Sequence, residues 1–91
     1  MISKILIVED SQTERTRLNT LLSKAGYNTI TAENGEVAVE EAKKNIPDLI
    51  LMDVNMPVMD GFAATRALRS NNSTKDIPVV MVTAKDQKAD K

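Results

Sequence analysis

Short apolar runs alternate along the chain with longer stretches whose apolar residues recur at helical spacing. The runs at 4–9, 48–53 and 78–83 are rich in leucine and β-branched side chains, which is typical of strands buried in a parallel sheet. The run at 27–32 is more polar and suits a strand at a sheet edge. Residues placed on the three intervening helices include Leu18, Leu21, Leu22 and Ala25, then Val37, Ala38, Glu41 and Ala42, and finally Ala64, Ala67 and Leu68 within 62–70.

Local signals mark the ends of the first helix and the start of the second. Asp10-Ser11 offers an N-cap, and Glu14 follows at the spacing of a capping box. Gly26 ends this helix, and Asn34-Gly35 provides a loop that can also cap the next one. The alternation of strands and helices predicts an α/β fold with a parallel sheet, right-handed crossovers and helices on both faces.

Composition excludes several functions for a protein with such a fold. Ninety-one residues with 27% charged side chains and a net charge of −1 make one domain (1–91) without the basic face that nucleic-acid binding requires. No apolar run approaches the roughly 20 residues that span a membrane. The residues before the first strand include no separate apolar region of the kind found in signal peptides, so we do not expect one here. The chain has no Cys and no His, so we expect a cytoplasmic protein whose metal chemistry uses oxygen ligands.

Two of the apolar runs end in acidic residues. Glu9 and Asp10 follow the first strand, and Asp53 ends the third. Because the carboxyl ends of parallel strands meet at the edge where open α/β folds bind ligands, we expect the three carboxylates to lie together. Their repulsion requires a cation or protons, and Mg²⁺ takes oxygen ligands of this kind. The pattern indicates a Mg²⁺-dependent phosphorylation site; the alternative is that Asp10 only caps a helix.

Asp53 is the candidate catalytic residue, because a carboxylate can act as a nucleophile and become an aspartyl phosphate while a metal neutralises charge. The alternative is a solvated strand-end acid, paired with a Lys. Thr83 ends the fourth strand, where its hydroxyl can donate to a phosphoryl oxygen or where it is simply a β-branched strand residue. Asn55 lies two residues beyond Asp53, and either its carbonyl reaches the same metal or its side chain forms a turn.

Three segments resemble the receiver domains of two-component response regulators. They read ILIVEDS at 5–11, DLILMDVNMPVMDG at 48–61 and IPVVMVTA at 77–84, and the resemblance extends over the whole chain. The arrangement is similar to the stand-alone receivers of chemotaxis, with a weaker likeness to those of twitching motility. The resemblance implies a flavodoxin-like, doubly wound parallel sheet with the site at its topological switch point.

The resemblance also implies a role for each residue at the site. Asp53 accepts phosphate from a histidine kinase, a phosphotransfer protein or a small phosphodonor. Asp10 and Asp53 bind Mg²⁺ through their side chains, with the Asn55 backbone carbonyl as a further ligand, and Glu9 orients a water of the metal. Thr83 hydrogen-bonds the phosphoryl group and carries the switch to a downstream effector protein.

The chain departs from the family at its carboxyl end. It stops at Lys91, where the family's fourth helix begins, so the fifth strand, the last helix, the Lys after that strand and its aromatic switch residue have no counterpart. We therefore expect a C-terminally truncated receiver with an incomplete sheet of four strands, in the order 2-1-3-4, and an exposed apolar edge at 79–82. Such an edge is a template for pairing with another chain, which predicts a homo-oligomer.

Two other functions compete with the signalling switch. A phosphatase of the aspartyl-nucleophile class needs a general acid two residues after its nucleophile, and Asn55 in that position cannot protonate a leaving group. The chain is therefore not expected to be an enzyme beyond its own phosphorylation and dephosphorylation. The remaining alternative is a non-signalling assembly module that self-associates through the strand at 79–82.

Overall fold

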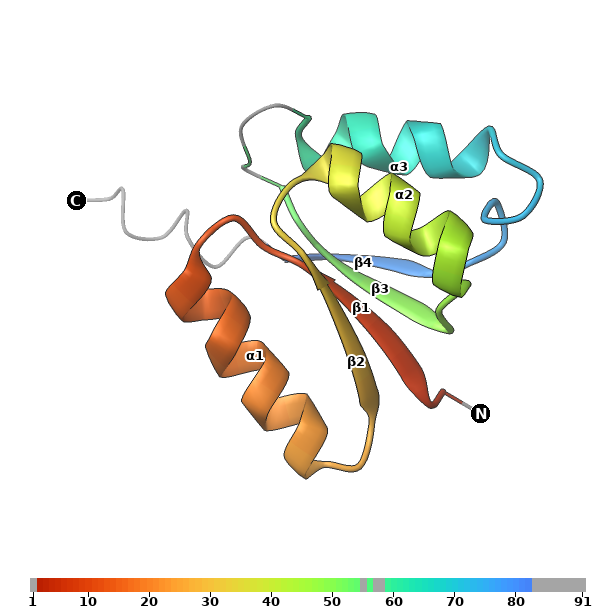
Figure 1. Ribbon diagram of the computed structural model, residues 1–91. Coiled ribbons are helices and arrows are strands. Elements are labelled where there is room, and N and C mark those ends of the chain that lie inside the picture. The colour runs from red at the N-terminus through yellow and green to blue at the C-terminus, as the bar shows by residue number, and fades with distance from the viewer. Residues whose placement is uncertain (1, 55, 57–58, 83–91) are drawn as a thin grey trace.

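Strands and helices alternate through the part of the chain that the computed structural model describes, which comprises residues 2–54, 56 and 59–82 (Figure 1). They are β1 (Lys4–Val8), α1 (Gln12–Lys24), β2 (Asn28–Ala32), α2 (Gly35–Asn45), β3 (Leu49–Asp53), α3 (Gly61–Arg69) and β4 (Val79–Val82). The strands among these residues form one parallel sheet in the order β2-β1-β3-β4. The predicted fold class, strand pairing and strand order are confirmed. None of the described helices is long and apolar enough to cross a membrane.

One face of the sheet holds the principal core. Side chains alternate between the two faces of a strand, and alternate apolar residues of β1 and β3 are buried against α2 and α3, which cover this face together (Figure 1). The core includes Leu6, Val8, Ile50 and Met52 from the strands and Ala38, Ala42, Ala64 and Leu68 from the helices. The small alanine side chains let both helices approach the sheet closely.

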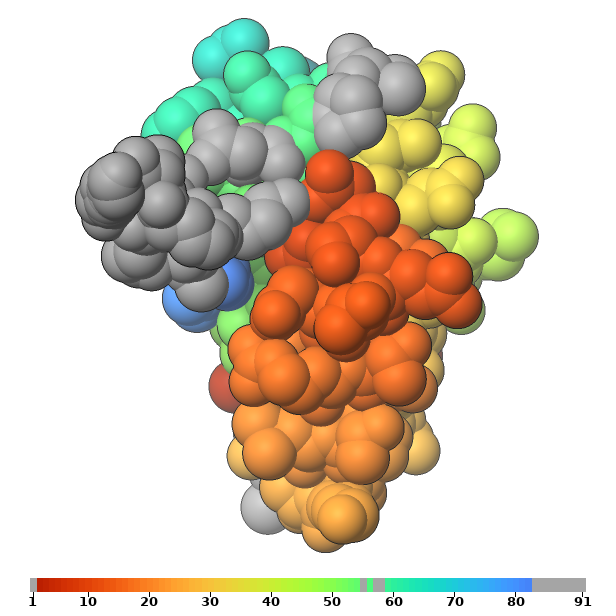
Figure 2. All heavy atoms as spheres, turned by 90° about the vertical axis from the view of Figure 1, so that its left-hand side faces the viewer, coloured from red at the N-terminus to blue at the C-terminus, as the bar shows by residue number. Residues whose placement is uncertain are grey.

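α1 lies on the opposite face of the sheet, where it packs on β1 and β2 (Figure 1). Its predicted apolar stripe is only partly buried: Leu18 and Leu22 are half-buried, Leu21 is 58% exposed, and no residue of this fully described helix is buried. Polar groups join the packing, since Thr29 of β2 donates a hydrogen bond to Asn19. The residues of the stripe thus lie on or beside the expected helix, and Leu21 is exposed because α1 forms an outer surface of the molecule (Figure 2).

β4 is the outer strand of the described sheet on the side away from β2. Val80 exposes 47% of its surface, whereas Val79 and Met81 pack partly against the core on the other face. The apolar outer strand expected from the sequence is thus present among the described residues.

Candidate functional site

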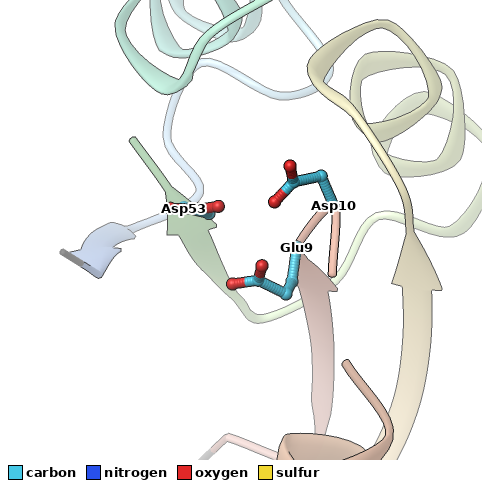
Figure 3. A group of neighbouring side chains, drawn as sticks. All are labelled: Glu9, Asp10 and Asp53. Carbon is cyan, nitrogen blue, oxygen red and sulfur yellow. The ribbon is translucent and has the colours of Figure 1, made fainter. Parts of the chain in front are cut away.

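The strand register brings three acidic side chains together at the carboxyl edge of the sheet. Val8 of β1 pairs with Met52 of β3, so the next residues along the two strands, Glu9 and Asp53, lie side by side, and Asp10 follows in the turn. Carboxylate oxygens from the three acids all lie within 4.8 Å of one another, and the groups converge in Figure 3. The expected proximity is confirmed.

The acids of the site are largely withdrawn from water. Glu9 is 3% and Asp53 2% exposed, while Asp10 is half-buried. Burying a charge is costly, and like charges repel strongly at such a separation. A cation offsets both effects, and a set of carboxylate oxygens is what a hard cation such as Mg²⁺ prefers. The residues present therefore fit the metal that the sequence indicated.

Hydrogen bonds of Glu9 and Ser11, the residues on either side of Asp10, fix the turn between β1 and α1. The Glu9 N–H donates to the Ala32 carbonyl at 3.0 Å, and its carboxylate accepts from the Ser11 N–H at 3.0 Å. Ser11 is the N-cap of α1, where its hydroxyl accepts from the Glu14 N–H at 3.3 Å. The alternative in which Asp10 serves only as the helix cap is therefore wrong, because Ser11 occupies that position.

A close backbone contact fixes the turn that follows Asp53. The Gly61 N–H donates to the Val54 carbonyl at 3.1 Å, and a Cβ on Gly61 would lie 2.6 Å from the Asp53 carbonyl oxygen, which is too close for any side chain. Asp60 caps α3, its carboxylate accepting from the Ala63 N–H at 2.8 Å. The sequence alone did not lead us to either role; an Asp-Gly pair before a helical stretch was the available signal.

Two predicted site residues, Asn55 and Thr83, lie outside the described residues. Their assignments, as a backbone ligand of the metal and as the hydroxyl that contacts the phosphoryl group, stay predictions. Within the described part of the chain, the candidate site consists of Glu9, Asp10 and Asp53.

Comparison with known proteins identifies the family. A profile of the response regulator receiver domain matches residues 5–91. Protein PilH of Pseudomonas aeruginosa is 47% identical over 90 residues, a match that covers 99% of this chain and 74% of that protein. The chemotaxis protein CheY4 of Vibrio cholerae gives a TM-score of 0.84 at 35% identity, covering 97% of this chain and 77% of that one. These neighbours agree with the flavodoxin-like topology expected from the sequence.

A further solved structure bears on the acidic cluster. The receiver domain of a sensor histidine kinase from Pseudomonas aeruginosa PAO1 gives a TM-score of 0.87 at 33% identity and covers 99% of this chain and 74% of that one. That structure has a magnesium ion coordinated in its active site cleft. From the family profile and the relatives together, the chain belongs to the response regulator receiver domains, which are the phosphoacceptor domains of two-component systems.

Proposed function

We propose that this chain is a signalling domain in which Asp53 takes up a phosphoryl group in a Mg²⁺-dependent reaction. The observation that carries the proposal is the meeting of the Glu9, Asp10 and Asp53 carboxylates within 4.8 Å at the ends of β1 and β3. An all-oxygen set suits Mg²⁺, and the magnesium ion of the related histidine-kinase receiver supports the same choice of metal.

In the proposed reaction, a carboxylate oxygen of Asp53 attacks the phosphorus of a phosphohistidine on a histidine kinase or phosphotransfer protein. The new O–P bond forms as the P–N bond breaks, and the departing imidazole keeps the electron pair and takes up a proton. Bound Mg²⁺ supplies positive charge that offsets repulsion between the carboxylate and the phosphoryl oxygens. We assign the chain no enzymatic activity beyond forming and hydrolysing this acyl phosphate.

The other site residues hold the metal and respond to the phosphoryl group. In this proposal Asp10 and Asp53 bind the ion through their side chains and Asn55 through its backbone carbonyl, while Glu9 orients water at the site. The Thr83 hydroxyl donates to a phosphoryl oxygen, and its movement changes the surface that a downstream effector protein contacts. We place this exchange in the cytoplasm, as is general for the family.

Incubation with acetyl phosphate and Mg²⁺, followed by intact-protein mass spectrometry, tests the proposal. We expect a mass increase of one phosphoryl group that hydroxylamine removes and that is absent with EDTA or in Asp53→Asn. Asp60→Asn is the matched control, because Asp60 caps the helix that follows the same turn and Asn is an equally good cap; it should keep the adduct. An adduct in Asp53→Asn would contradict the proposal, and turnover of many phosphoester substrates would favour a phosphatase instead.

A second candidate function, a non-signalling assembly module, is favoured by one specific observation. β4 is the outer strand among the described residues, and Val80 on it is 47% exposed. An apolar outer strand offers backbone groups for pairing with another chain, and we infer that copies of this chain form a homo-oligomer through it. Size-exclusion chromatography with light scattering tests the inference, and a stable monomer at micromolar concentration would contradict it.

A further inference from the structure

The side chain of Arg15 reaches from the first turn of α1 back to the turn that carries the acids. Its Nη1 donates a hydrogen bond to the Glu9 carbonyl at 2.8 Å, in a partly buried position. Its own N–H donates to the Ser11 carbonyl at 2.8 Å, so the helix and the turn are joined at two points. We infer that Arg15 is a positioning residue that orients Asp10 for metal binding, an inference that rests on the function proposed above.

The Glu9 carbonyl is a point from which Asp10 can be oriented. It belongs to the planar peptide that links Glu9 to Asp10, so a bond to its oxygen fixes the rotation of that plane and the direction in which the Asp10 side chain leaves the backbone. The bonds from the Glu9 N–H to Ala32 and from the Ser11 N–H to the Glu9 carboxylate, each at 3.0 Å, hold the residue from other sides. The Arg15 bond alone among these acts on the linking peptide itself.

Loss of the Arg15 side chain is expected to leave the fold intact. The Arg15 guanidinium has five donors, and only one of them is needed for the bond to the Glu9 carbonyl. The others can donate to water, because the group is accessible to solvent. The side chain lines a hollow of about 230 Å³ together with Thr31, Ala32, Glu33 and Val37. Because this hollow has polar as well as apolar walls and opens to solvent, water can replace a shortened side chain, and no dry cavity is left.

Replacing Arg15 removes both a positive charge and a hydrogen bond to Glu9, and these two losses are expected to change Mg²⁺ affinity in opposite directions. A cationic group near the acids repels a second cation, so removing its charge alone would strengthen Mg²⁺ binding. Removing the bond to Glu9 lets the linking peptide rotate and misdirects Asp10, which weakens binding. Changing the partners of metal ligands typically lowers metal affinity about 10–100-fold, which is larger than the effect of one partly screened charge.

A Mg²⁺ titration of the full chain, followed by NMR amide shifts, tests the inference. We expect Arg15→Ala to bind Mg²⁺ about tenfold more weakly than the wild type, and Arg15→Lys, which keeps the charge and a donor, to recover most of the loss. Arg17→Ala is the matched control, because it removes the same charge from the same helix while Arg17 pairs with Glu14 at 2.7 Å. The control should bind as the wild type does or more tightly, and equal affinities of Arg15→Ala and Arg17→Ala would overturn the inference.

A second measurement, without metal, separates this inference from the proposed function. The Ser11 N–H donates to the Glu9 carboxylate, so a loosened turn should speed hydrogen exchange at Ser11 in Arg15→Ala and not in Arg17→Ala, with unchanged circular dichroism. If the wild type bound no Mg²⁺, the metal dependence of the proposed function would fail, and exchange at Ser11 would still decide whether Arg15 holds the turn. Unchanged exchange in Arg15→Ala contradicts the positioning role.

Discussion

The exposed carboxylate of Asp48, just before β3, forms hydrogen bonds with residues at the start of β1. Its Oδ2 accepts from the backbone N–H groups of Ser3 and Lys4, each at 2.9 Å, and from the Ser3 hydroxyl at 3.2 Å. The start of β3 is thereby joined to the start of β1, at the edge of the sheet opposite to the acidic site. The hydrogen bonds from the N–H of Ser3 and then of Lys4 lower the pKa of the Asp48 carboxyl from its ordinary value, because they favour the ionised form.

We expect these bonds to make stability depend on pH at the acidic end of the range. A carboxyl whose pKa is lower in the folded state stabilises the fold above the unfolded pKa, which is about 4 for Asp, and loses that contribution as the pH falls through the folded value. Urea denaturation should show the wild type more stable than Asp48→Asn by a constant amount from neutral pH down to about 4. The difference should shrink at lower pH, and a difference that grows there would contradict the assignment.

Gly61 is expected to matter for the site as well as for stability. A Cβ there would lie 2.6 Å from the Asp53 carbonyl oxygen and 3.0 Å from the Val54 Cα. In Gly61→Ala the first turn of α3 and the end of β3 must therefore move apart, at a cost of about 1–3 kcal/mol. Because Asp53 is the last residue of β3, this movement displaces the phosphoacceptor. Chemical denaturation and phosphorylation by acetyl phosphate should both report a loss.

Gly26→Ala is the control for this prediction. Gly26 has a φ of +101°, and a Cβ there would have nothing within 4 Å, so the substitution costs about 1–2 kcal/mol through the backbone alone. The yield of phosphorylated protein should stay at the wild-type level in Gly26→Ala and fall in Gly61→Ala. Equal yields in the two variants would show that Gly61 serves stability only.

At the scale of elements, the end of α2 stores backbone strain. Ile46 follows the helix with a φ of 45°, a left-handed conformation that costs a residue with a Cβ about 1–2 kcal/mol. Its N–H donates to the Ala42 carbonyl at 2.8 Å, so the strained residue closes the last turn of the helix. Glycine or asparagine is the usual residue at such a helix end.

A pair of variants separates this strain from the loss of the isoleucine side chain. Ile46→Asn and Ile46→Ala both remove the apolar surface of a residue that is 45% exposed, but asparagine tolerates the left-handed region better than alanine does. We expect Ile46→Asn to be more stable than Ile46→Ala by about 0.5–1 kcal/mol, measured from urea unfolding. If the two variants unfold at the same urea concentration, the helix end is not strained.

The elements could be predicted because their signals are local, and the acidic site could be predicted because parallel strand ends meet at one edge. Contacts that depend on how closely two elements approach each other could not be predicted in this way. The Ser11 N–H bonds the Glu9 carboxylate and not that of Glu14, as a capping box requires, and Glu14 pairs with Arg17 instead. The need for glycine at position 61 likewise depends on the distance between α3 and β3, which no local pattern encodes.

At the scale of the whole molecule, the described helices cover the two faces of the sheet unequally. α2 and α3 share one face, and α1 lies on the other, against β1 and β2 (Figure 1). On the α1 side, Leu49 and Leu51 of β3 are half-buried and Val80 of β4 is exposed. Apolar surface therefore gathers toward the outer strand, and association of copies would remove it from water.

Val80→Lys tests whether β4 pairs copies of the chain. A lysine on an outer strand disfavours pairing because its charge would be buried between chains, and the fold should lose at most about 1 kcal/mol because Val80 is already 47% exposed. Light scattering should report a lower average mass than for the wild type at equal concentration. Asn28→Lys is the matched control, since Asn28 is exposed on β2, the outer strand of the other side. If the control lowers the mass as much as Val80→Lys does, added charge explains the change, and association through β4 is excluded.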